Sequence, residues 1–128
     1  MQVYNKNSLK ELKKYLYNSD DIHDSEIINF IYSADNNKIS VELLSPITKE
    51  RKKLCFEDLK IVYLSAKIQL DVSSTVNSLT VEDDYSYLEE SIRQLDKDID
   101  NYIYLLFQMF SGVEIHIVSK ALYIETYT

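Results

Sequence analysis

Alternation of apolar and polar residues is the clearest pattern in the chain, and it predicts most of a β-sheet. Residues 26–32 are apolar on most of both faces, and residues 39–43 alternate cleanly after an Asp-Asn-Asn turn, so the two stretches form a predicted hairpin. A basic loop at 49–53 leads to a short strand at 54–56. In residues 62–72 every second residue is apolar, which predicts one face on a core and one in solvent.

The C-terminal part of the chain predicts further strands. Residues 102–110 are strongly apolar, and the Ser-Gly pair at 111–112 is a two-residue turn signal. Residues 113–117 then return with strict alternation. Lys120 interrupts the pattern, and residues 121–127 supply a last strand.

Two other stretches have the period of an amphipathic helix. Residues 8–18 place leucines on one face, and Ser8 with Glu11 has the spacing of a capping box at the helix start. Residues 81–99 carry apolar side chains at alternating steps of four and three, with acidic residues in the first turn. The chain shows no repeat and no linker. We therefore predict one α+β domain over residues 1–128, with a largely antiparallel sheet of about six strands and two helices.

Composition places the chain among globular proteins, with 45% apolar and 27% charged residues. No apolar run approaches the ~20 residues that a membrane-spanning helix needs. The first residues lack the apolar centre of a signal peptide. A single cysteine, Cys55, excludes an internal disulfide. These features predict a cytoplasmic protein without a membrane partner.

A single glycine, Gly112, excludes the common nucleotide sites. Loops that hold phosphate need several glycines, because backbone N–H groups must approach the phosphate without an intervening Cβ. A nucleophile elbow also needs more than one glycine. We therefore expect no nucleotide cofactor, and no other cofactor is indicated.

The triplet His23-Asp24-Ser25 holds three residue types of catalytic triads side by side. Adjacent residues in an extended segment point to opposite faces, so these three side chains do not converge without help from elsewhere. The alternative is a turn at the entrance of a strand, in which Asp24 or Ser25 bonds a nearby backbone group. This geometry favours the structural interpretation, and His23 and Asp24 remain weak catalytic candidates.

Metal binding has little support in the sequence. His23, His116 and Cys55 are the soft ligands, and they lack the spacing of a zinc site. A mixed site of His23, Asp24 and His116 needs the first and penultimate strands to be neighbours. Residues 96–107 begin like a calcium loop but lack the required glycine and final glutamate. No metal is expected.

Charge is concentrated on the second predicted helix. Residues 82–100 hold eight acidic and two basic residues, within a chain of net charge −7. This distribution disfavours nucleic acid, which needs clustered Lys and Arg. It is typical either of a solvated helix face or of a surface that attracts a basic partner. The residues proposed to contact that partner are Glu89, Glu90, Arg93, Asp96 and Lys97.

The segment Ile22-His23-Asp24-Ser25-Glu26-Ile27, the later Phe56-Glu57-Asp58-Leu59 and the hairpin at 111–115 resemble a group of small bacterial proteins with a His-Asp-Ser motif. Some similar chains accompany polymorphic toxins, where a small acidic immunity protein occludes its toxin. The resemblance implies a binding role and assigns no catalytic residue.

We therefore expect a non-enzymatic protein-binding module, of immunity type or regulatory, that presents an acidic helix to a basic partner. The alternative is a small hydrolase or ligand-binding domain that uses His23, Asp24 and His116. A third hypothesis is a structural subunit that dimerises through an open sheet edge at the last strand.

Overall fold

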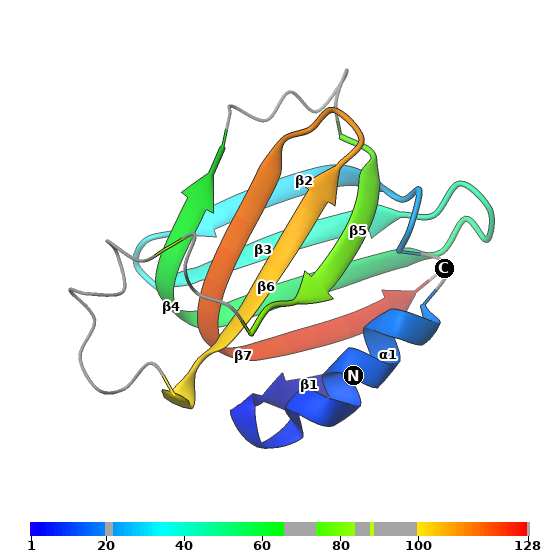
Figure 1. Ribbon diagram of the computed structural model, residues 1–128. Coiled ribbons are helices and arrows are strands. Elements are labelled where there is room, and N and C mark those ends of the chain that lie inside the picture. Colours follow the sequence, from blue (N-terminus) through cyan, green and yellow to red (C-terminus); the bar gives the residue numbers. More distant parts are fainter. Residues whose placement is uncertain (20–21, 66–73, 84–87, 89–99, 128) are drawn as a thin grey trace.

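In the described part of the chain, a curved antiparallel sheet has one α-helix packed beside it, as Figure 1 shows. The computed structural model describes residues 1–19, 22–65, 74–83, 88 and 100–127. The small α+β class and the antiparallel sheet predicted from the sequence are confirmed. The elements, in chain order, are β1 (Gln2–Asn5), the 3-10 helix η1 (Lys6–Ser8), α1 (Leu9–Asn18), β2 (Glu26–Ser33), β3 (Lys38–Leu44), β4 (Arg51–Leu64), β5 (Val76–Val81), β6 (Ile103–Met109) and β7 (Glu114–Tyr127).

Strand β7 organises the sheet. The strands follow the order β2-β3-β4-β7-β6-β5, and β1 also pairs with β7. One edge of β7 pairs with β4 from Ile115 to Tyr127. The other edge pairs first with β6, up to Ser119, and then with β1, from Ala121. The strand is therefore continuous through Lys120, where its partner changes, and the predicted interruption at that residue is wrong.

The long strands β4 and β7 bend, so that the sheet folds into two layers. Figure 1 shows β5 and β6 crossing in front of β2 and β3, with α1 beside them. The two ends of the strand order also meet, because Glu26 of β2 forms a bridge with Thr75. Between the layers lies a core in which Phe56 of β4 meets Phe107 of β6 edge to face, with ring centroids 6.2 Å apart.

Helix α1 forms where residues 8–18 predict it, and Leu12 is its fully buried contact with the core. The predicted capping box is wrong in detail. Ser8 makes no side-chain cap for α1. A capping box instead begins η1, where the Asn7 N–H donates to Asn5 Oδ1 (2.8 Å) and the Asn5 N–H donates to Ser8 Oγ (2.9 Å). The chain thus enters α1 through a short, tighter helix.

Several predicted boundaries are corrected by strand β4. Arg51 to Lys53 belong to this strand rather than to a basic loop, and the two strands predicted at 54–56 and 62–72 are one strand up to Leu64. The pairing shifts between Leu59 and Ile61. Beyond that bulge the predicted core face is exposed: Val62 is 36% and Leu64 38% exposed, because they line an open hollow with Phe30. Residues 66–72 lie outside the described residues.

The structure describes only a few residues of the second predicted helix. Val81 is the last residue of β5, so the predicted start of the helix is wrong. Leu88 is buried against Tyr104 and Val118 on the outer side of β6 and β7, and the rest of 84–99 lies outside the described residues. The described part of the chain thus has seven strands and one α-helix, where about six and two were predicted. None of its helices is long and apolar enough to cross a membrane.

The fold predicts that the buried face of α1 stabilises the domain. Replacing Leu12 by alanine removes a side chain with 0% exposure, so we expect the free energy of unfolding to fall by about 2–5 kcal/mol. Urea denaturation followed by circular dichroism measures this change. Tyr17→Ala on the same helix is the control, since Tyr17 is 89% exposed and should cost less than about 0.5 kcal/mol. Equal losses in the two variants would contradict this packing.

Candidate functional site

A cleft of about 340 Å³ lies between α1, the turn at 22–25 and β5. Its apolar lining comes from Leu16, Ile22, Leu79 and Val81. Its polar lining includes Lys13, Tyr17, Ser19, His23, Ser78 and Thr80. Ile22 and Leu79 are buried, so the apolar part continues into the core. Such a mixture of apolar surface and a few polar groups is typical of binding sites.

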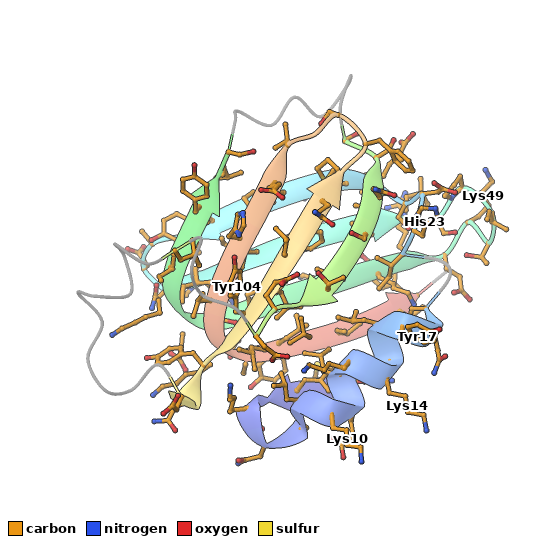
Figure 2. All side chains as sticks on the ribbon, viewed as in Figure 1. Lys10, Lys14, Tyr17, His23, Lys49 and Tyr104 are labelled. Atoms are coloured by element: carbon orange, nitrogen blue, oxygen red, sulfur yellow. The ribbon has the colours of Figure 1, made fainter. Side chains whose placement is uncertain are left out.

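His23 stands in this cleft, and its ring is held by a neighbouring strand (Figure 2). Its Nδ1 makes a short hydrogen bond with the backbone carbonyl of Asn77, in the bulge of β5. A carbonyl only accepts, so Nδ1 carries the proton. Nε2 then faces Asp24 Oδ1 at 3.5 Å, and this contact becomes an ion pair only if the imidazole is protonated. The His23 side chain is 54% exposed.

The backbone of the triplet joins the two ends of the sheet. The Asp24 N–H donates to the carbonyl of Val76, and the Val76 N–H donates to the carbonyl of Ser25, each at 2.8 Å. Asp24 has a φ of 70°, in the left-handed region that favours Gly, Asn and Asp. Ser25 is 1% exposed. The three side chains therefore differ in environment: one imidazole at the cleft, one half-exposed carboxylate and one buried hydroxyl.

His116 lies elsewhere in the fold. It is 2% exposed, on the outer side of β7, and its Nδ1 is 2.5 Å from Tyr104 Oη. Its Nε2 is 3.4 Å from Glu114 Oε1, and the Tyr63 ring meets it edge to face at 5.5 Å. His116 does not line the cleft described above. The site of His23, Asp24 and His116 considered from the sequence is therefore not assembled in the described structure.

Cys55 belongs to no cluster of metal-ligand side chains within the described residues. Among the described residues, no three His, Cys, Asp or Glu side chains gather as they would around a metal ion. Cys55 lies on the outer face of β4. Burial raises the pKa of its thiol above the ordinary value, and Glu57 raises it further, whereas Lys38 and Lys53 oppose the shift. The thiol is thus protonated at neutral pH, which makes it a weak nucleophile.

Two acidic residues from the start of the predicted acidic segment, Glu82 and Asp83, bond to residues of the cleft lining. Asp83 Oδ2 accepts from Lys13 Nζ at 2.8 Å, and Glu82 Oε1 accepts from the Thr80 hydroxyl at 2.8 Å. Glu89, Glu90, Arg93, Asp96 and Lys97 lie outside the described residues.

The sequence interpretation missed two features of this site. One is the basic character of η1 and α1, which carry Lys6, Lys10, Lys13 and Lys14 against one acid, Glu11. Their spacing on a predicted helix is the signal that could have shown it. Figure 2 shows Lys10 and Lys14 pointing away from the sheet. The other is Asn77, whose carbonyl holds His23 from 54 positions away and which no local pattern indicates.

Comparison with known proteins shows a shared fold. No family model and no curated protein matches the chain. The crystal structure of an uncharacterized protein from Neisseria gonorrhoeae is similar, with a TM-score of 0.52 and 10% sequence identity. The match covers 80% of this chain and 91% of that one. A similarity at this identity concerns the fold and assigns no chemistry to either protein.

The backbone at Asp24 gives a direct test of the structural interpretation of the triplet. Asp24→Gly and Asp24→Ala both remove the carboxylate, but only alanine is strained at a φ of 70°. We expect the alanine variant to be less stable than the glycine variant by about 1 kcal/mol in urea denaturation. Equal stability of the two would show that the turn adapts. A loss in both, equal and large, would assign the role to the carboxylate instead.

Proposed function

We propose that the protein is a non-enzymatic binding module whose cleft between α1 and β5 receives a lysine or arginine side chain of a basic partner protein. The observation that supports this proposal is an apolar cleft with carboxylates at its rim. Leu16, Ile22 and Leu79 offer apolar surface to an aliphatic stem. Asp83 lies where the cationic head would emerge, bonded to Lys13 of the lining.

The charges around the cleft also support a cationic ligand. Asp24, Glu82 and Asp83 are close to its lining residues, while Lys13 is the one permanent cation among the lining residues that the structure describes. The chain continues from this rim into the acidic segment 84–99, of which the structure describes Leu88 alone. In our proposal Glu89, Glu90, Arg93, Asp96 and Lys97 contact the same basic partner. An acidic field of this kind accelerates association with a basic protein.

The resemblance to small bacterial proteins with a His-Asp-Ser motif is consistent with an immunity-type or regulatory role. The alternative, a small hydrolase or ligand-binding domain, has weaker support. His116 is buried against Tyr104, apart from the cleft that contains His23. A general base needs a partner nucleophile within hydrogen-bond reach, and the hydroxyl of buried Ser25 does not line the cleft. A binding function requires neither arrangement.

A blocked tripeptide, N-acetyl-Gly-Arg-Gly-amide, tests the cleft directly. We expect weak binding, with a Kd on the order of 1 mM, and amide shifts in NMR spectra at Leu79 and Val81. Asp83→Lys should weaken the binding by about two- to fivefold, because an exposed charge pair contributes at most about 1 kcal/mol. Asp35→Lys, in the distant β2–β3 turn, is the control. Equal shifts with the Gly-Glu-Gly analogue would contradict a cation site.

The acidic segment requires a separate experiment with the natural partner. The tagged wild-type chain and a triple variant (Glu89→Lys, Glu90→Lys, Asp96→Lys) are used to recover bound proteins from the native host. We expect the variant to lose a basic protein that the wild type retains, because reversal turns attraction into repulsion. A triple reversal at Glu11, Asp35 and Glu50 is the matched control. Unchanged recovery with the acidic-segment variant would refute the electrostatic part of the proposal.

A further inference from the structure

The outer face of the layer formed by β2, β3, β4, β7 and β1 is arranged in three rows of side chains. The strand register sets these rows, since neighbours in a row are cross-strand partners. The central row consists of Ile31, Ser40, Cys55, Tyr123 and Val3. The first flanking row consists of Asn29, Glu42, Lys53 and Glu125. The second flanking row consists of Ser33, Lys38, Glu57, Ala121 and Asn5.

No helix or strand within the described part of the chain covers this face, and Met1 lines a hollow of about 320 Å³ on it together with Lys53, Cys55, Glu57, Tyr123 and Glu125. The residues that alternate with these rows, such as Val41, Phe56 and Ile124, point to the core, and none of the core clusters includes a member of the three rows. Ile31 and Val3, at the two ends of the central row, are 52% and 50% exposed. An uncharged row on an exposed sheet face, flanked by charged rows, has the composition of a protein interface.

We propose that this face is the contact surface of a homodimer, with the two-fold axis lying along the central row. Rotation about that axis stacks the two sheets face to face and places the first flanking row of one copy over the second flanking row of the other. Each member of the central row then meets its own counterpart, as in any isologous interface.

Charge complementarity favours a second copy of the chain as the partner that binds this face. On β3 the rotation brings Glu42 over Lys38 of the other copy, and on β4 it brings Lys53 over Glu57 of the other copy. Both pairs are of opposite sign, and each occurs twice. Within one described chain no ion pair joins any two of these four residues. In the same chain Glu42 lies opposite Lys53, and Lys38 lies opposite Glu57, so the rotation gives each charge a second neighbour of opposite sign.

The size of the face predicts a weak dimer. Five strands about 4.8 Å apart, each contributing about five residues of ~3.4 Å, give a flat footprint of about 400 Å² per copy. Side-chain relief enlarges this area, yet it stays below or near the ~800 Å² per partner of a standard interface. Each copy also carries a net charge of −7, which opposes association, and the three rows themselves hold three acidic residues and two lysines. The dimer should therefore depend on concentration and on the pairs named above.

Sedimentation velocity of the full chain, from micromolar to millimolar concentration, tests the dimer. We expect a monomer–dimer equilibrium that Lys53→Glu weakens by about tenfold or more, because each altered contact occurs twice across the axis. The double variant Lys53→Glu/Glu57→Lys restores the pair between copies and should recover the wild-type Kd within about threefold. Within one chain the swap has no such benefit, since Lys53 faces Glu42 and Glu125 and Glu57 faces Lys38.

Controls separate dimerisation from folding. Thermal melts show whether each variant folds. If Lys53→Glu does not fold, the same test is made with Glu42→Lys and with the double variant Glu42→Lys/Lys38→Glu. Cys55→Asp places two carboxylates against each other at the axis and should abolish the dimer, whereas Cys55→Ser should retain it. Lys10→Glu, on the outer side of α1, should change nothing. A wild-type chain that stays monomeric at millimolar concentration, or a folded double variant that fails to recover, would overturn the proposal. Neither result bears on the cleft, which shares no lining residue with this face.

Discussion

The pairing of β7 is the constraint on which the rest of the fold depends. This strand satisfies backbone groups of β4 along one edge and of two different strands along the other. Along the second edge the partner changes between Ser119 and Ala121, and Figure 1 shows that the strand also bends along its length. The bend divides the sheet into two layers. Ile115 and Ile117 before it, and Leu122 and Ile124 after it, all reach the same core.

The cleft forms because the two-layered sheet closes where β5 approaches β2. Once β5 and β2 approach each other, the backbone groups at the end of each strand need partners, because buried N–H and C=O groups are costly when unpaired. The turn at 22–25 supplies these partners through Asp24 and Ser25, and the imidazole of His23 takes one more carbonyl. Helix α1 shields the remaining edge of β5, as proteins commonly do with exposed edges. The space left between helix, turn and edge is the cleft.

Local patterns in the sequence predicted the elements whose environment is uniform along their length. Helix α1 and strand β3 each have one buried face, so apolar spacing revealed them. The prediction failed where tertiary pairing decides. Lys120 is exposed within a continuous strand because it sits at the change of partner, and the four residues of β1 are too few to show a period. Val62 and Leu64 alternate like core residues, yet they project into an open hollow.

For the site, the sequence identified a residue but could not identify its role. His23 was a candidate because of its neighbours, Asp24 and Ser25, whereas its ring is held by Asn77, far along the chain. Three residue types adjacent in the sequence do not show that their side chains converge, because convergence depends on how the sheet closes.

The charge pattern of the outer face also depends on the sheet. Glu42 with Lys38, and Lys53 with Glu57, are each separated by four residues on a strand, so they share a face without touching. That spacing gives each strand opposite charges on either side of a neutral residue, which is the arrangement that a two-fold rotation makes complementary.

Stacked through that face, two copies would leave both clefts open to solvent, because the cleft lies between α1 and β5 and uses none of the stacked residues. A dimer of this geometry would offer a basic partner two sites, and two linked sites bind a repeated or dimeric partner more tightly than either site does by itself.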